Sequence, residues 1–418
     1  MKKTTLLSMG ILALGIGNAI AAPSNIQKTY HDHTSILNEI NVNGTNPLTW
    51  FNADATEKQQ HEGPLMAFIE QSFSYFNLTN PIEGAPRDQA WYLLHAHLNI
   101  RLHDSDKDLG TWLKVEISGS SAFNPKARKY GSLAESTGTI ANVHTDVFDH
   151  EVYYLPEVAL LHSMSKIRSA LIIGVVNQTN YIDINSYANT PFTQFIGSPY
   201  VNNQVIPLVD GNLGFVWETQ FTPSSYIMLS ASFTGTDPGH SPVDNLRSQD
   251  YNVMAEFGWQ YESAWGEGVL RVQPFFFTID HSGYAGIAAN VEQNLGKSPF
   301  ALFARAGWNN AEETSIGGAT AQVSGGIIFK QMFQNMNLFK EEEGNFFGLA
   351  FNVTKPDKAD MPEERSKAKR EYGFEATYSF FINQHFCLQP VYQVTYNPAL
   401  RDDTRSSQTF AIQCILSF

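Results

Sequence analysis

Apolar and polar side chains alternate strictly along the last residues of the chain, and this alternation constrains the fold more than any other feature. In the closing stretch QTFAIQCILSF, Phe410, Ile412, Cys414, Leu416 and Phe418 share one face of an extended strand. Terminal residues of a globular domain usually fray into solvent, so an apolar stripe that ends on an aromatic residue needs an apolar neighbour. Lipid is such a neighbour, and the stretch therefore indicates a strand on the surface of a membrane barrel.

The same alternation marks sixteen candidate strands. They are 66–76, 90–102, 111–119, 151–162, 168–177, 212–221, 225–234, 251–261, 268–278, 284–294, 299–308, 319–330, 346–354, 372–381, 386–396 and 409–418. Tight connectors, at MSKI, TPSS, GKS and NQH, alternate with long polar ones at 120–150, 178–211, 235–250 and 355–371. Barrels of the bacterial outer membrane have short periplasmic turns, long outer loops and strands of about 9 to 11 residues. The sequence thus predicts an all-β fold, a transmembrane antiparallel β-barrel of about 16 strands.

The first residues are typical of a secretory signal peptide. Two lysines precede an uncharged apolar run at 6–16, and small residues precede Pro23. We assign 1–22 to a cleaved signal peptide, 23–62 to an irregular periplasmic or lumen extension, and 63–418 to the transmembrane barrel. The rest of the chain has no apolar run of about eighteen residues that would predict a membrane helix. These features predict the outer membrane of a Gram-negative bacterium.

The composition limits the kinds of molecule that the protein is expected to contact. Charged residues make up 16% of the chain and the formal net charge is −14, which argues against nucleic acid or anionic headgroups as electrostatic partners. The expected surroundings are instead the lipid bilayer and lipopolysaccharide. Cys387 falls on the inward face of its strand and Cys414 on the outward face, so a disulfide between them is not expected.

Polar residues of the predicted strands fall on the face opposite the apolar stripes. The predicted lumen wall comprises His95, His97, Arg101, Lys114, Glu116, Glu157, Glu218, Glu256, Arg271, Arg305 and Glu375. An Arg or Lys that faced lipid at the bilayer midplane would cost about 2–4 kcal/mol. The sorting therefore predicts a water-filled lumen, and the simplest interpretation of each residue is that it hydrates a wide pore.

The connector after the fifth predicted strand carries a more specific signal. Residues 178–211 are longer than a tether requires, and they combine aromatic rings with amides and only two acids. Folded into the barrel, the connector would form a constriction whose side chains select solutes. The predicted solute contacts are Asp183, Asn185, Tyr187, Asn189, Gln194, Phe195 and Asn202. Rings that stack on a pyranose and amides that bond its hydroxyls suit a sugar; the alternative is an antigenic surface loop.

The stretch IIGVVNQTNYIDINSYANTPFTQFIGSPYVNN, with FALFARAGW, CLQPVYQVTYNP and the closing ILSF, resembles the carbohydrate-selective porin (OprB) family of Gram-negative outer membranes. The similarity is best over 150–418. It implies a sixteen-stranded barrel through which monosaccharides and small oligosaccharides diffuse inward, without ATP or a cofactor. The positions that match the family motifs are Asp183, Asn185, Tyr187, Ala188, Asn189, Gln194, Phe195, Arg305 and Trp308.

The sequence is also compatible with other porin functions. A siderophore porin of the LbtU type, which would pass a ferric chelate, and a general non-selective porin both stay open. No catalytic residue or cofactor is predicted, although His144, Asp146, Asp149 and His150 supply the residue types of an omptin-like protease in an outer loop. His31 with His33, and His95 with His97, form i,i+2 pairs, but no third or fourth ligand follows at a fixed spacing, so no metal site is predicted.

Two kinds of protein partner are also expected. The outer-membrane assembly machinery would read the C-terminal strand that ends at Phe418. A homotrimer would be usual for a porin of this size.

Overall fold

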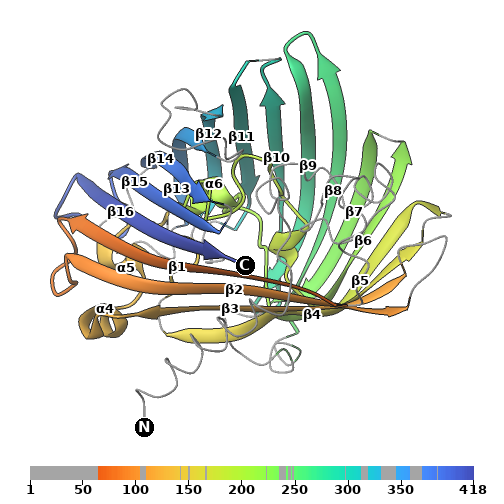
Figure 1. Cartoon of the computed structure of the whole chain (residues 1–418), viewed down its shortest axis with the longest axis horizontal. Helices are drawn as coiled ribbons and strands as arrows, with labels where there is room; N and C mark the ends of the chain where they lie inside the picture. Colours follow the sequence, from red (N-terminus) through yellow and green to blue (C-terminus); the bar gives the residue numbers. More distant parts are fainter. Residues whose placement is uncertain are drawn as a thin grey trace.

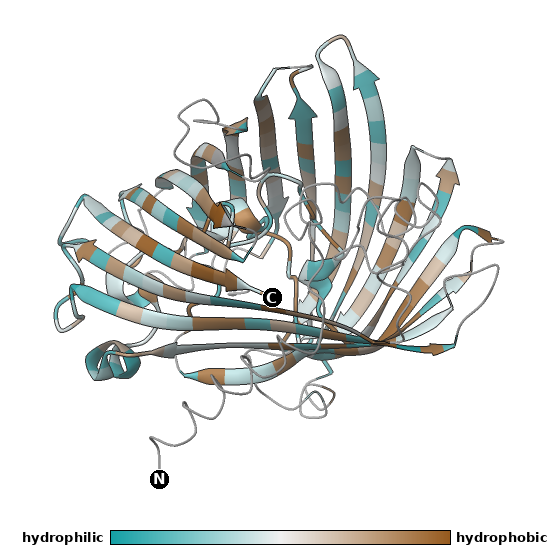
Figure 2. Ribbon diagram, in the orientation of Figure 1, coloured by the Kyte–Doolittle hydropathy of each residue, from teal (hydrophilic) through white to brown (hydrophobic). Residues whose placement is uncertain are grey.

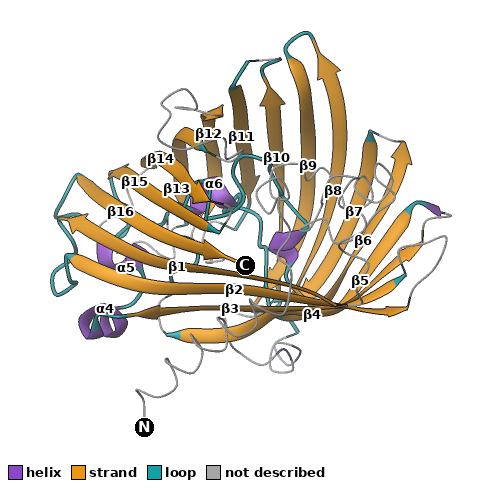
Figure 3. Cartoon of the chain, in the orientation of Figure 1, coloured by secondary structure: helices purple, strands orange, loops and turns teal. Residues whose placement is uncertain are grey.

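The computed structural model describes residues 65–418, apart from internal segments of which the longest are 104–109, 235–241, 312–318, 331–344 and 358–369. Sixteen strands make up most of this part of the chain (Figures 1 and 3). They are β1 (Leu65–Thr79), β2 (Asp88–His103), β3 (Thr111–Ala122), β4 (Val152–Met164), β5 (Ser169–Val176), β6 (Asn212–Thr222), β7 (Ser225–Phe233), β8 (Tyr251–Ser263), β9 (Gly266–Ile279), β10 (Ser282–Asn294), β11 (Phe300–Asn309), β12 (Ala319–Lys330), β13 (Phe346–Pro356), β14 (Glu371–Asn383), β15 (Phe386–Tyr396) and β16 (Ser406–Ser417). Each strand begins and ends within three residues of its predicted bounds.

The sheet closes on itself. Each strand pairs with its neighbours in sequence, and β1 closes the barrel by pairing antiparallel with β16, from Glu70 opposite Ser417 to Thr79 opposite Gln408. The backbone of Phe418 exchanges two hydrogen bonds of 2.9 Å with that of Ile69, so pairing continues to the last residue. Closure gives every described strand a partner on both sides. The predicted closed antiparallel barrel of sixteen strands is confirmed.

Hydrophilic and hydrophobic residues alternate in bands along the strands (Figure 2). The outer face is apolar, whereas the inner face carries buried polar side chains together with buried apolar clusters, such as the one that contains Phe195, Tyr200 and Phe303. Large apolar side chains such as Phe257, Trp308 and Phe351 are about half exposed on the outer face. Polar side chains such as Arg271 and Gln389 are completely buried on the inner face. A soluble sandwich buries its apolar face, so this arrangement is that of a barrel whose outer surface meets lipid.

The connectors alternate in length as predicted, with two exceptions. Two-residue links at 223–224, 264–265 and 384–385 lie at one end of the barrel, and the long connectors 123–151, 177–211, 234–250 and 357–370 lie at the other. At the long-loop end, however, Asp280 and His281 join β9 to β10 in a tight turn with φ of 46° and 65°, which a primed hairpin turn requires. At the opposite end, β12 and β13 are separated by fifteen residues.

In the part of the chain that the structure describes, helical structure is confined to the connectors. Helices α4 (Pro125–Tyr130) and α5 (Leu133–Thr137) lie between β3 and β4, and the 3-10 helix η4 (Gln178–Asn180) and helix α6 (Ser198–Val201) lie between β5 and β6. Within the described residues, every helix is too short or too polar to cross a membrane.

Both cysteines are free thiols, as their predicted placement on opposite faces required. Cys387 is buried on the inner face, and Cys414 is half-buried on the outer face. The predicted signal peptide at 1–22 and the extension at 23–62 lie outside the described residues.

Candidate functional site

The predicted wall residues all lie on strands of the barrel. His95, His97 and Arg101 lie on β2, Lys114 and Glu116 on β3, Glu157 on β4, Glu218 on β6, Glu256 on β8, Arg271 on β9, Arg305 on β11 and Glu375 on β14. Nine of the eleven are buried, and His95 and Arg101 are half-buried. Seven of them contact the connectors β3–β4 or β5–β6. The interior polar groups are therefore largely bonded to protein.

The β5–β6 connector (177–211) is held to the far wall by an ion pair. Nε of Arg305 lies 2.9 Å from Oδ2 of Asp183, and Nη2 donates to the Asp183 carbonyl oxygen at 2.8 Å. Both side chains have 0% exposure, and Asp183 adopts a left-handed φ of 64°. Burial raises the pKa of Asp183, whereas Arg305 and donors from Asn203 and Asn290 oppose the rise. The convergence of these donors on one carboxylate supports an ionised pair.

Wall carboxylates accept hydrogen bonds from the backbone of this connector. Glu375 accepts from the N–H groups of Ile196 and Gly197 at 2.8 and 2.9 Å. Glu256 accepts from the N–H of Asp183 at 2.9 Å. An irregular segment has no ladder partners of its own, so these acids satisfy N–H groups that would otherwise be buried without an acceptor.

Close apolar packing accompanies these polar contacts. The ring of Phe195 lies 5.6 Å from that of Tyr200 and 5.3 Å from that of Phe303 on β11. A side chain at Gly307, also on β11, would place its Cβ 2.3 Å from Val205 of the connector. The connector therefore approaches the β11 wall as closely as only a glycine permits.

The β3–β4 connector (123–151) also lies against the inner wall, which corrects the prediction that it is an outer loop. Glu371 on β14 accepts from the N–H groups of Ile140 and Ala141 at 3.1 and 3.0 Å. His144 has 0% exposure, and its Nε2 lies 3.0 Å from Oε1 of Gln413 on β16. The protease interpretation required His144 at an accessible rim, and its complete burial does not favour that interpretation.

The predicted solute contacts divide into two groups. Asp183, Asn185, Gln194 and Phe195 have 0% exposure and Tyr187 has 7%, whereas Asn189 and Asn202 are half-buried. Nδ2 of Asn185 donates to Asn290 on β10 at 2.7 Å, and the hydroxyl of Tyr187 donates to Asn294 on β10 at 2.5 Å. The buried group is therefore bonded within the protein. Asn189 and Asn202 are more exposed than these five residues, but Oδ1 of Asn189 is itself buried.

Several wall residues that hold the connectors were missed in the sequence. They are Asn290, Glu292, Asn352, Glu371 and Gln413. Each is buried on a strand whose outward neighbours are more exposed. Strict period-2 counting along β10, β13, β14 and β16 would have included all five.

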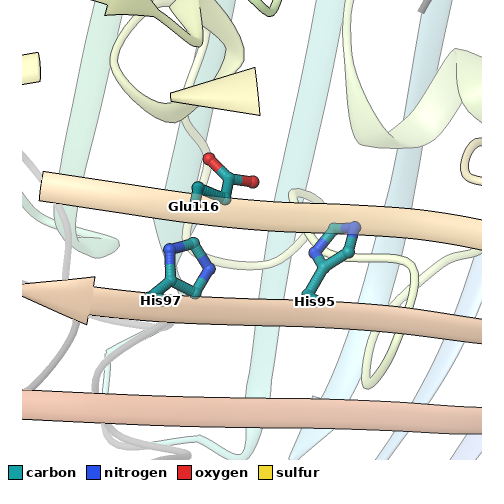
Figure 4. Close-up of side chains that lie close together, drawn as sticks. All are labelled: His95, His97 and Glu116. Carbon is teal, nitrogen blue, oxygen red and sulfur yellow. The ribbon is translucent and has the colours of Figure 1, made fainter. Parts of the chain in front are cut away.

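A cluster of potential metal ligands lies on β2 and β3, where none was predicted. His97 is directly opposite Glu116 in the strand pairing, and His95 lies two residues before His97 on the same face. Figure 4 shows the two imidazoles and the carboxylate turned toward a common space, and their ligand atoms lie within 4.8 Å of one another. No third ligand follows the histidine pair at a fixed spacing in the sequence, and the carboxylate of Glu116 joins the pair from the adjacent strand.

Comparison with known proteins agrees with this geometry. Residues 172–414 match the profile described as "Carbohydrate-selective porin, OprB family". The chain is 24% identical over 242 residues to "Porin AaxA" of Chlamydia pneumoniae, covering 56% of this chain and 52% of that protein. It is 27% identical over 190 residues to an uncharacterized protein of Aquifex aeolicus, covering 44% of this chain and 49% of that protein. The chain thus matches about half the length of these relatives.

Solved structures show the same fold. The high-pH structure of Pseudomonas putida OprB superimposes with a TM-score of 0.65, at 11% identity, over 85% of this chain and 94% of that one. The low-pH structure of the same protein gives a TM-score of 0.51, also at 11% identity, over 85% of this chain and 93% of that one. The family profile spans more than half of the 418 residues. The chain therefore belongs to the carbohydrate-selective porin, OprB family.

Proposed function

We propose that the protein is an outer-membrane porin through which small hydrophilic solutes, foremost carbohydrates, diffuse passively. The observation that carries the proposal is the closed barrel with apolar side chains outside and polar side chains inside. Such a barrel is stable in lipid and offers a polar interior to solutes. Family membership supports carbohydrate as the solute class.

The β5–β6 connector is the proposed constriction. Its contacts with Arg305 on β11, Asn290 on β10 and Glu375 on β14 reach wall strands far from its own ends on β5 and β6. A segment bonded to several parts of the wall holds a fixed position, and a fixed segment in the interior narrows the passage. The fully buried residues then position the constriction instead of touching the solute.

We assign contact with the solute to Asn189 and Asn202, the half-buried members of the predicted set. An amide both donates and accepts hydrogen bonds, which suits the hydroxyl groups of a sugar. A charged solute would be favoured by a ring of one sign instead. In this interior the charges of Asp183 and Arg305 are paired with each other, and so are those of Lys114 and Glu157.

Single-channel recording in planar bilayers tests this proposal. The purified protein should conduct, and millimolar glucose or maltose should reduce the conductance. Asn202→Ala should raise the half-blocking sugar concentration about fivefold, since one net hydrogen bond is worth roughly 1 kcal/mol. Asn310→Ala, which changes an exposed asparagine beyond the end of β11, is the matched control and should leave the block unchanged.

The other outcomes identify the alternatives. Conductance without block by any sugar would favour a general porin. Block by a ferric chelate alone would favour the siderophore alternative, which the family match does not support. Absence of conductance from correctly folded protein would contradict a porin function altogether.

The surroundings of the barrel complete the proposal. The exposed apolar band fits the bilayer and lipopolysaccharide of a Gram-negative outer membrane, reached after cleavage of the signal peptide at 1–22. The paired C-terminal strand, which ends at Phe418, is the proposed signal for the assembly machinery. A homotrimer is the proposed assembly, as is usual for porins of this size.

A further inference from the structure

We propose that the inner wall binds one divalent transition-metal ion, with Zn²⁺ as the best fit, through His95, His97 and Glu116. Two imidazoles and one carboxylate form a donor set that zinc prefers, and their ligand atoms already lie within 4.8 Å of one another. A bound ion would draw these atoms closer, which rotation of the side chains allows.

The carboxylate of the cluster is already oriented. Oε2 of Glu116 accepts from Nδ2 of Asn180 at 2.8 Å and from Nδ2 of Asn177 at 3.1 Å. Outer hydrogen bonds of this kind fix metal ligands in known sites. Because both amides belong to the β5–β6 connector, an ion at this position would be linked to the placement of that connector.

Two further carboxylates, Asp146 and Glu70, lie beside His95. Oδ2 of Asp146, from the β3–β4 connector, forms an ion pair with Nε2 of His95 at 3.1 Å. Glu70 is directly opposite His95 on β1; its Oε1 accepts from the hydroxyl of Ser417 at 3.3 Å, whereas its buried Oε2 lacks a donor. A buried carboxylate oxygen without a donor is costly, and a cation nearby would remove the cost.

The side chain of Lys114 is already paired with another acid. Nζ of Lys114 lies 2.7 Å from Oε1 of Glu157, in a buried pair that also contacts the ring of Tyr181. Glu70, Glu116 and Asp146 therefore lie close to the two imidazoles, with Asp146 paired to His95. The side chain of His95 keeps 21% exposure, which gives an ion a route from the lumen.

Equilibrium dialysis of the purified full-length protein against Zn²⁺, with metal analysis, tests the proposal. His31→Gln/His33→Gln serves as the background, because this second histidine pair lies outside the described residues and could bind zinc by itself. In that background, we expect one Zn²⁺ per chain. Glu116→Gln, which preserves shape, and His97→Gln should each weaken binding at least tenfold. His281→Gln, at the exposed β9–β10 turn, is the matched control and should bind normally.

A second measurement separates loss of the site from loss of the fold. Each variant should show the same heat-modifiable gel mobility as the background protein, and Zn²⁺ should raise the unfolding temperature only where the three ligands are intact. Absence of stoichiometric zinc from the folded background protein would overturn the proposal. Zinc binding by Glu116→Gln and His97→Gln that is as tight as binding by the background protein would overturn it as well.

Discussion

Buried ionisable side chains in this barrel hold irregular chain segments in place. Arg305 illustrates the arrangement: its Nη1 donates to the carbonyl oxygen of Tyr200 at 2.5 Å, while its other nitrogens bind Asp183. One guanidinium thereby ties together two parts of the connector that are seventeen residues apart in sequence. Its five fixed donors suit this role, which a lysine could not fill.

Asp183→Asn should release the constriction without opening the barrel. The substitution leaves Arg305 buried without a counter-charge, and breaking a buried pair costs about 3–5 kcal/mol. Because the backbone hydrogen bonds between the strands are unchanged, this loss of stabilising free energy affects the connector and not the barrel. We expect higher single-channel conductance and weaker sugar block, with unchanged gel mobility of the folded barrel.

Two controls accompany this variant: a change at a distant aspartate and a double change of the ion pair. Asp402→Asn, at an exposed aspartate between β15 and β16, should leave conductance unchanged. Asp183→Asn/Arg305→Gln should cost less than the sum of the two single changes in urea titrations, because no unpaired charge remains. Wild-type conductance from folded Asp183→Asn would contradict the anchoring role.

At the scale of elements, the two inward connectors form a second layer inside the barrel. The N–H of Thr145 in the β3–β4 connector donates to the carbonyl oxygen of Ile196 in the β5–β6 connector at 3.0 Å. The ring of Phe192 lies 4.8 Å from that of His95 on the wall. The connectors therefore support each other as well as contacting the strands.

Two acids on β14 should control these connectors separately. Glu371→Ala removes the acceptor for Ile140 and Ala141, whereas Glu375→Ala removes the acceptor for Ile196 and Gly197. Hydrogen-exchange mass spectrometry should show loss of protection at 138–148 in the first variant and at 194–202 in the second.

Each of these variants is the control for the other. Because the connectors touch, a smaller loss at the partner connector is expected in both. Equal loss of protection over all strands would mean instead that the barrel itself had been destabilised.

The strands and the inward face of the wall could be predicted from sequence, whereas the contacts across the interior could not. Alternation is a local pattern, so the bounds of β16 or β10 follow from a dozen consecutive residues. The partner of Ile140, Glu371, is 231 residues away, and nothing local in 138–148 indicates it. The pairing of His97 with Glu116 depends on the register of β2 and β3, which the length of the intervening turn sets. The three-residue cluster therefore appeared only in the structure.

At the scale of the whole molecule, large apolar side chains lie on the outer surface of the barrel. The stability of the barrel therefore depends on lipid around this outer face. Ile287 lies near the middle of β10 with 52% exposure, and its cross-strand neighbours are Pro274 on β9 and Trp308 on β11. Trp308 is 51% exposed, so these residues form part of a continuous apolar outer surface. In water such a surface would promote aggregation, and in a bilayer it stabilises the folded state.

Ile287→Arg tests this outer surface at mid-strand. Near the bilayer midplane the substitution should lower the free energy of unfolding by about 2–4 kcal/mol, measured by urea titration in phospholipid vesicles with gel mobility as the readout. Tyr251→Arg is the matched control: it is also outward, at 41% exposure, but it begins β8 and should lie near the interface, where the cost falls to about 0–1 kcal/mol. In detergent micelles, where water reaches the strand more easily, the difference between the two variants should shrink. Equal effects of both variants in vesicles would mean that depth in the membrane does not set the cost, and the outer face would then need a protein partner instead of lipid.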